Sequence, residues 1–175
     1  MLLLCNTYNL KVFKIFASAF VDIFHHFNNS CTDSRTHKGY RLFAIDGSDI
    51  DRSCDSNSDS FIVTNQKPNG FNKIHLNALY DLCNKTYFDI LLQPTPKEDE
   101  HKALQVMLKR NKFFGKNIIL ADRGYEGYNT IAHLTETPNV DFLFRAKHGD
   151  GAFRKIRELP MCELDEDITV EISTT

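Results

Sequence analysis

The sequence predicts an α/β protein in which a mixed β-sheet is flanked by helices. Two apolar runs, 40–45 and 117–121, each stop at an aspartate, first Asp46 and then Asp122, and a glycine-containing turn follows each of them. A buried strand with a carboxylate at its carboxyl end is typical of open α/β sheets, whose ligand sites lie at that edge. The segments along the chain follow the order β-β-β-α-β-α-β, which indicates a sheet with both neighbouring and crossover connections.

The first helix is expected over 8–27, because phenylalanines recur there at three- and four-residue steps and form one apolar stripe. A polar linker over 28–39 leads into the first strand at 40–45. Residues 51–60 are mostly aspartate, serine and asparagine, which favours a surface loop.

Two antiparallel strands are expected over 73–82 and 86–93, because apolar and polar residues alternate in both. A helix over 98–111 follows, with Asp99 and Glu100 in its first turn, where negative charge stabilises a helix. The remaining expected elements are a strand at 117–121, a helix at 129–136 and a strand at 141–147.

The length of the chain and its charge limit the number of domains and the classes of function that fit the sequence. The 175 residues fit one domain, and 42% hydrophobic residues suffice for a core. With 21 basic and 23 acidic side chains, the net charge of −2 gives no overall signal for nucleic acid. Basic residues do cluster at 109–116 and 145–157, either as DNA contacts or as ordinary solvated surface. The five cysteines form no C-x-x-C pair, and no apolar run is long enough to span a bilayer.

Three strings carry a family resemblance: R-L-F-A-I-D-G-S-D-I from residue 41, H-L-N-A-L-Y-D-L-C-N-K-T-Y-F-D-I-L-L-Q-P from 75, and I-L-A-D-R-G-Y-E-G-Y-N from 119. In this order and spacing the chain resembles, over 40–147, the catalytic domain of bacterial DDE transposases of the IS-four type. The resemblance implies an RNase H-like mixed sheet, flanked by helices and incomplete at the C-terminus. It divides the chain into an N-terminal helix and linker (1–39), a partial catalytic core (40–149) and the start of a β-rich insertion (150–175).

The resemblance also implies a function, DNA transposition, through metal-dependent DNA strand cleavage and strand transfer at transposon ends. Asp46 and Asp122 are then the expected catalytic residues and metal ligands. Their hard oxygen donors suit magnesium or manganese. For each aspartate the alternative is a helix cap or a turn residue. The implied partners are double-stranded DNA and other copies of the chain, and the implied location is the cytoplasm, at the nucleoid and away from membranes.

Four residues are expected to bind DNA. Arg123 and Tyr125 belong to the D-R-G-Y motif and are expected to contact the DNA backbone or to position Asp122; the alternative is a surface arginine and a packed tyrosine. Arg145 and Lys147 belong to the second basic cluster. No helix-turn-helix or zinc module is recognisable, so any DNA binding is expected to be electrostatic.

The third carboxylate of the family is a glutamate in the pattern Y-x-x-R-x-x-x-E-x-x-x-x-x-x-K, which is not found in this chain. The nearest partial match places Glu158 four residues after Arg154, with Gly151 in place of the tyrosine and Asp165 in place of the lysine. We therefore expect an inactive fragment without its third ligand. Two alternatives stay open: a non-catalytic DNA-binding or regulatory remnant, and an RNase H-like nuclease that uses Glu158 or Glu126.

Overall fold

The structure is a computed structural model that describes residues 35–146 and 153–160, together with positions 19, 21–23, 25–26, 162, 163, 165, 167 and 169. In chain order the described elements are β1 (Tyr40–Arg52), β2 (Phe61–Thr64), β3 (Lys67–Asp81), β4 (Thr86–Pro94), the 3-10 helix η1 (Thr95–Lys97), α2 (Glu100–Arg110), β5 (Lys116–Ala121), the 3-10 helix η2 (Arg123–Tyr125), α3 (Tyr128–Glu136), β6 (Val140–Phe144) and α4 (Arg154–Arg157).

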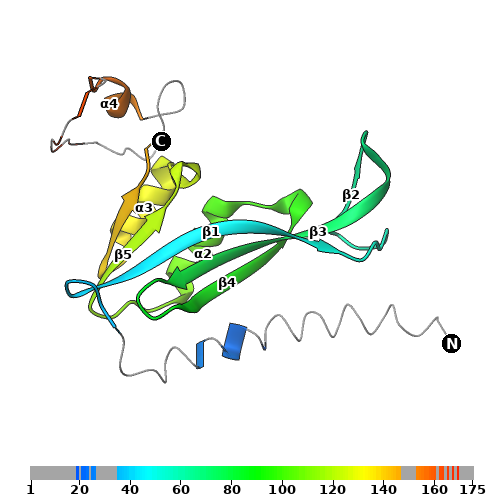
Figure 1. Cartoon of the computed structure of the whole chain (residues 1–175), viewed down its shortest axis with the longest axis horizontal. Helices are drawn as coiled ribbons and strands as arrows, with labels where there is room; N and C mark the ends of the chain where they lie inside the picture. The colour runs from blue at the N-terminus through cyan, green and yellow to red at the C-terminus, as the bar shows by residue number, and fades with distance from the viewer. Residues whose placement is uncertain are drawn as a thin grey trace.

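The six strands form one mixed sheet in the order β2-β3-β1-β5-β6, with β4 also paired to β3 (Figure 1). The long strand β3 pairs antiparallel with β1 along one edge. Along its other edge it pairs with β2 near its start and with β4 near its end. The pairs β1–β5 and β5–β6 are parallel. The parallel half of the sheet therefore places the carboxyl end of β5 beside the middle of β1.

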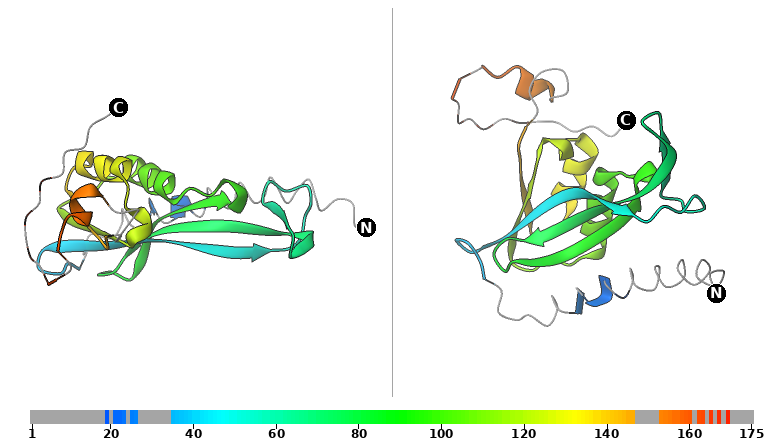
Figure 2. Two further views of the ribbon diagram at one scale, coloured as in Figure 1. Left: turned by 90° about the horizontal axis from the view of Figure 1, so that it is seen from above. Right: turned by 45° about the vertical axis from the view of Figure 1, so that its right-hand side comes forward.

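Both long helices cover the same face of this sheet (Figure 2). Leu104 and Met107 of α2 and Leu134 of α3 are fully buried, in one cluster with Phe43 of β1 and Ile119 of β5. Burial of such side chains stabilises the fold by about 1.5–3 kcal/mol each. The core thus fixes α2 and α3 against the strands that carry the two aspartates.

The start of α2 is set by a capping interaction. Asp99 is the N-cap residue, and its side chain accepts a hydrogen bond from the backbone N–H of Lys102 at 2.9 Å. A cap of this kind satisfies one of the free amide groups at a helix start. Glu100 is therefore the first residue of the helix, and its side chain is not needed for the cap.

The predicted mixed α/β sheet flanked by helices is confirmed. The strand pair around 73–93, the helix at 98–111, the strand at 117–121 and the helix at 129–136 are all present, with ends that differ by a few residues. The expected helix at 8–27 lies mostly outside the described residues, although the positions described within it are helical. Within the described part of the chain, no helix is long and apolar enough to cross a membrane.

The prediction that the first strand ends before Asp46 is wrong. β1 continues to Arg52, because residues 46–52 pair antiparallel with β3, which itself begins at Lys67. The short strand β2 was not predicted either. Residues 46–52, β2 and the start of β3 form an arm that extends beyond the helices (Figure 1), so most of their side chains are exposed. Their sequence therefore lacks the alternation of apolar and polar residues that marks a strand covered on one face.

Candidate metal centre

Asp46 and Asp122 lie level with each other on adjacent parallel strands. The pairing of β1 with β5 ends at the pair Ala44–Leu120, and each aspartate stands two residues beyond it. Because side chains alternate along a strand, a two-residue step returns to the same face of the sheet. The two aspartates therefore lie on neighbouring strands, just beyond the point at which the pairing of β1 with β5 ends. Asp122 follows the end of β5, whereas Asp46 lies inside β1.

Each aspartate also binds the backbone of the turn that follows it. Asp122 Oδ1 accepts a hydrogen bond from the N–H of Gly124 at 2.6 Å, and Asp46 Oδ1 accepts one from the N–H of Gly47 at 2.9 Å. These are the turn contacts that the sequence offered as the alternative to metal binding. They do not exclude a ligand role, because an ionised carboxylate has about four acceptor sites. Both side chains remain exposed.

Glu100 reaches from the start of α2 into the space beside both aspartates. A Cβ atom placed on Gly47 would lie well under 3.0 Å from Glu100 Oε1, closer than real Cβ atoms approach. A Cβ on Gly124 would lie 3.8 Å from Glu100 Oε2 and 2.8 Å from Asp122 Oδ1. The carboxylate of Glu100 is thus lodged between the two glycines that follow the aspartates. From the sequence, Glu100 was expected only to stabilise the start of the helix with its negative charge.

His75 of β3 is the second residue that sequence reasoning missed. It is 7% exposed, and its Nδ1 lies 2.9 Å from Asp49 Oδ1 and 3.5 Å from Glu98 Oε2. Its Nε2 lies 3.2 Å from Glu100 Oε1, which is ion-pair distance without the alignment of a good hydrogen bond. The imidazole therefore stands among three carboxylates.

The side chains of Asp49, His75 and Glu98 form a second possible cation cluster. Their ligand atoms all lie within 4.8 Å of one another, a spacing that Asp46, Glu100 and Asp122 do not reach. Lys73 Nζ also lies 2.9 Å from Asp49 Oδ2. Hydrogen bonds from His75 and Lys73 hold the pKa of Asp49 below its ordinary value of 3.8. This cluster therefore already contains a positive charge of its own.

Tyr125, in η2, carries a buried hydroxyl. The residue is 2% exposed, and its Oη has no hydrogen-bond partner among the described residues. Burial raises the pKa of Tyr125 above its ordinary value of 10.0, and the negative charges of Glu100, Asp46 and Asp122 raise it further. A buried ring does not offer a surface to the DNA backbone, so the structure agrees with the packed tyrosine that the sequence offered as the alternative.

The other expected site residues lie apart from this centre or on the surface. Arg123 and Arg145 are exposed, and Lys147 lies outside the described residues. Glu158 is exposed and pairs with Arg154 in α4 at 2.9 Å, which lowers the pKa of its carboxyl group. Figure 1 shows α4 separated from the sheet. Glu126 is 8% exposed and accepts a hydrogen bond from the N–H of Phe153 at 3.1 Å, so its carboxylate is engaged in packing that segment.

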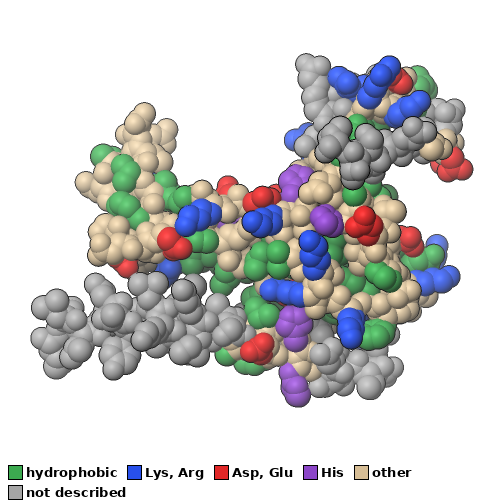
Figure 3. Space-filling model, turned by 180° about the vertical axis from the view of Figure 1, so that it is seen from behind, with side chains coloured by type: hydrophobic (Ala, Val, Ile, Leu, Met, Phe, Trp, Pro, Cys, Tyr) green, Lys and Arg blue, Asp and Glu red, His purple; other side chains and the backbone are tan. Residues whose placement is uncertain are grey.

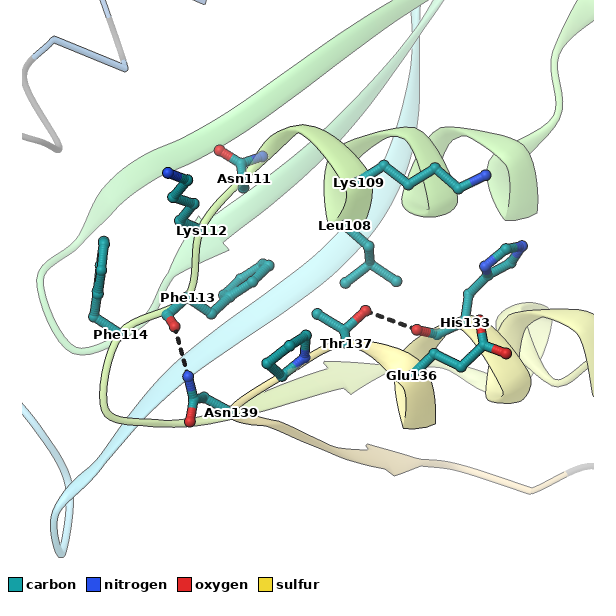
Figure 4. A pocket seen from close by; sticks show the side chains of 11 residues that line it. Leu108, Lys109, Asn111, Lys112, Phe113, Phe114, His133, Glu136, Thr137 and Asn139 are labelled. Carbon is teal, nitrogen blue, oxygen red and sulfur yellow. Dashed lines mark hydrogen bonds between the residues drawn. The ribbon is translucent and has the colours of Figure 1, made fainter.

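A pocket of about 510 Å³ lies at the opposite end of the two helices (Figure 4). Its walls are the last turns of α2 and α3 and the loops after them, including Leu108, Phe113 and Pro138. Glu100 stands at the first turn of α2 and Asp122 precedes α3, so the pocket is not part of the carboxylate centre.

A mixed sheet of this order, with carboxylates level on its two central parallel strands, defines an RNase H-like domain. A family model described as "Transposase DDE domain" matches residues 37–161, and the chain belongs to this family. Domains of this family act in DNA transposition and use divalent metal ions, in agreement with the resemblance seen in the sequence. The finer assignment to the IS-four type stays a prediction.

Comparison with other proteins adds little to the family assignment. No curated protein matches the chain. Among solved structures, a piggyBac transposase in a synaptic complex with hairpin DNA aligns with a TM-score of 0.39 and 13% identity. The alignment covers 68% of this chain and 24% of that chain. A likeness of this strength has no bearing on function.

Proposed function

We propose that Asp46 and Asp122 together hold a divalent cation, magnesium or manganese, and that the chain uses it on the phosphodiester bonds of DNA during transposition. The observation that supports this proposal is the level placement of the two aspartates on neighbouring parallel strands. Two carboxylates of adjacent strands lie about 5 Å apart at their backbones, which suits ligands that share one hydrated ion.

The residues of the chain have separate roles in this proposal. Asp46 and Asp122 supply the negative charge, and the turn contacts with Gly47 and Gly124 orient their carboxylates. A bound divalent cation would polarise the attacked phosphodiester and stabilise the leaving oxygen. Arg123, exposed beside Asp122, supplies a positive charge for the DNA phosphate next to the one attacked.

Double-stranded DNA is the proposed substrate, and phosphate contacts provide most of the proposed affinity. Lys and Arg side chains are spread over the face shown in Figure 3 and are most concentrated on α4, which carries Arg154, Lys155 and Arg157. Contact with the ends of a transposon, association of copies on DNA and a nucleoid location belong to the same proposal.

The proposed function is tested by manganese titration and by a DNA nicking assay. Purified chain should bind Mn²⁺ in calorimetry, and Asp46→Asn and Asp122→Asn should each weaken that binding at least about tenfold, because each removes a charged ligand. Glu136→Gln, an exposed change at the far end of α3, is the control and should bind as the unchanged chain does. Equal binding by all four proteins would overturn the proposal.

A further inference from the structure

We propose that Glu100 is the third carboxylate of the centre formed by Asp46 and Asp122, and that His75, held by Asp49, positions it. This inference rests on the proposed function, since it completes the same metal site. It replaces the expectation that the chain lacks a third ligand and assigns that role to the first turn of α2.

The first argument is the open edge of β1. The last residue of β1 that pairs with β5 is Ala44, so Asp46 and Gly47 have no strand beside them on that edge. Strand alternation directs Asp46 away from the face that α2 covers, since the neighbouring Ile45 is buried in the core. Glu100 arrives from the helix side. Because no strand pairs with this edge of β1 beyond Ala44, side chains from both faces of the sheet can approach it there.

The second argument is the pair of glycines. Any Cβ at position 47 would collide with both Glu100 Oε1 and His75 Nε2, and a Cβ at position 124 would approach Glu100 Oε2 and Asp122 Oδ1. Gly47 and Gly124 each follow one of the aspartates closely in the sequence. The missing side chain of Gly47 provides the space that the end of Glu100 occupies, whereas Gly124 leaves room for the carboxylate of Asp122 and lies in ordinary contact distance of Glu100. The glycine of the D-G pattern is thereby explained by the neighbouring glutamate.

The third argument is the orientation of Glu100 by His75. His75 is almost fully buried, and its Nδ1 is held by Asp49 at 2.9 Å, so the ring has a fixed position. Its Nε2 lies 3.2 Å from Glu100 Oε1. One oxygen of Glu100 therefore lies next to His75, while Oε2 is the oxygen nearer to Gly124. Outer partners of this kind commonly fix the orientation of metal ligands.

The fourth argument is the hydroxyl of Tyr125. A buried hydroxyl without a partner is costly, and Tyr125 is 2% exposed with no partner for Oη among the described residues. The negative charges of Glu100, Asp46 and Asp122 all act on this hydroxyl and add to the effect of burial in raising its pKa. Three negative charges that act on one buried hydroxyl without a partner are the setting that a positive ion with oxygen ligands would stabilise.

The experiment measures Mn²⁺ binding by calorimetry on the full chain, with the fold of each variant checked by circular dichroism. Glu100→Gln should weaken binding at least about tenfold, as Asp122→Asn does. Glu98→Gln is the matched control: it makes the same change two residues away and removes a member of the other cluster. It should bind as the unchanged chain does.

The outcomes separate the inference from the proposed function. If Asp46→Asn and Asp122→Asn weaken binding and Glu100→Gln does not, Glu100 is no ligand but the proposed function stands. If Glu98→Gln weakens binding and Glu100→Gln does not, the cation lies at Asp49, His75 and Glu98, and the inference is overturned. If neither Asp46→Asn nor Asp122→Asn weakens Mn²⁺ binding, the proposed function itself fails.

The positioning role of His75 has its own test. His75→Leu removes the contact with Glu100, whereas His75→Gln keeps a donor that can reach it. At a temperature where both variants are folded, the leucine variant should bind Mn²⁺ about tenfold more weakly, and the glutamine variant should recover part of that loss. A lower melting temperature with unchanged Mn²⁺ affinity in both variants would show that His75 has only a packing role.

Discussion

His75 Nε2 of β3 lies 3.2 Å from Glu100 Oε1 of α2, and both atoms occupy the space where a side chain on Gly47 would stand. A strand, a helix and a glycine turn thereby meet beside Asp46. The contact between His75 and Glu100 therefore joins the antiparallel arm of the sheet to the place where Asp46 and Asp122 lie on neighbouring parallel strands.

Substituting Gly47 with alanine should separate metal binding from folding. The added methyl group would displace the end of the Glu100 side chain, which is flexible, and the ring of His75, which is buried. We expect a loss of about 1 kcal/mol in the free energy of unfolding, because mild overpacking can be relieved by side-chain movement. Mn²⁺ affinity should fall about tenfold.

The matched control for this change is Ser48→Ala, at the next and exposed position of β1. Urea denaturation measures the free energy of unfolding of both variants, and calorimetry measures their Mn²⁺ affinity. Unchanged Mn²⁺ affinity in Gly47→Ala would show that the glycine does not serve the approach of Glu100.

Removing the hydroxyl of Tyr125 should not destabilise the protein when no metal is bound. Because Oη has no partner among the described residues, Tyr125→Phe removes a desolvated polar group and keeps the buried ring. We expect the free energy of unfolding in EDTA to stay equal or to rise by about 1 kcal/mol. A loss of more than about 1 kcal/mol would mean that the hydroxyl makes a stabilising hydrogen bond in the folded protein.

Asp81 is expected to be one of the polar residues on which the fold depends most. It is fully buried, pairs with Arg41, and accepts backbone hydrogen bonds from Cys83 at 3.0 Å and Asn84 at 2.9 Å in the turn between β3 and β4. Asp81→Ala should lower the free energy of unfolding by about 3 kcal/mol, because it leaves Arg41 and the turn amides without their acceptor. Asp141→Ala, on the exposed side of β6, should change it by less than about 0.5 kcal/mol. Urea unfolding curves of the two variants measure both changes in the free energy of unfolding.

The pH dependence of stability should reveal the environment of Asp49. Its pKa is lower in the folded protein than the ordinary 3.8, so its contribution is fully present above that value and is lost as the pH falls through the folded pKa. The difference in unfolding free energy between the unchanged chain and Asp49→Asn should therefore be constant at neutral pH and shrink below pH 3.8. A difference that grows on acidification would contradict the contacts with His75 and Lys73.

DNA binding should be electrostatic and nearly independent of sequence. Arg123→Ala should weaken binding to transposon-end and scrambled duplexes by the same factor and should reduce the slope of log K against log salt by about 1. Lys67→Ala, exposed at the start of β3 and outside both basic clusters, is the control for loss of one charge. A hundredfold preference for one duplex near physiological salt would reveal a recognition element in the chain.

The sequence predicted the strands that carry Asp46 and Asp122, because apolar runs that stop at an aspartate are a local signal. It did not predict Glu100, since an acidic residue in a first helical turn is already explained by the helix dipole. It did not predict His75 either, because its contact with Asp49 depends on the register of β3 against β1 beyond the covered part of the sheet. Gly47, directly after Asp46, was the one sequence signal for these two residues, because a glycine marks a close approach by another side chain.

The most direct test of the central claim is anomalous diffraction from crystals of the chain soaked in Mn²⁺. We predict an anomalous peak at the edge of the sheet between β1 and η2, with carboxylate oxygens of Asp46 and Asp122 about 2.1 Å from it. With Glu100 as the third ligand, its Oε2 should lie at the same distance from that peak or from a second one about 4 Å away. A peak at Asp49, His75 and Glu98 with none beside Asp46 and Asp122 would contradict the account.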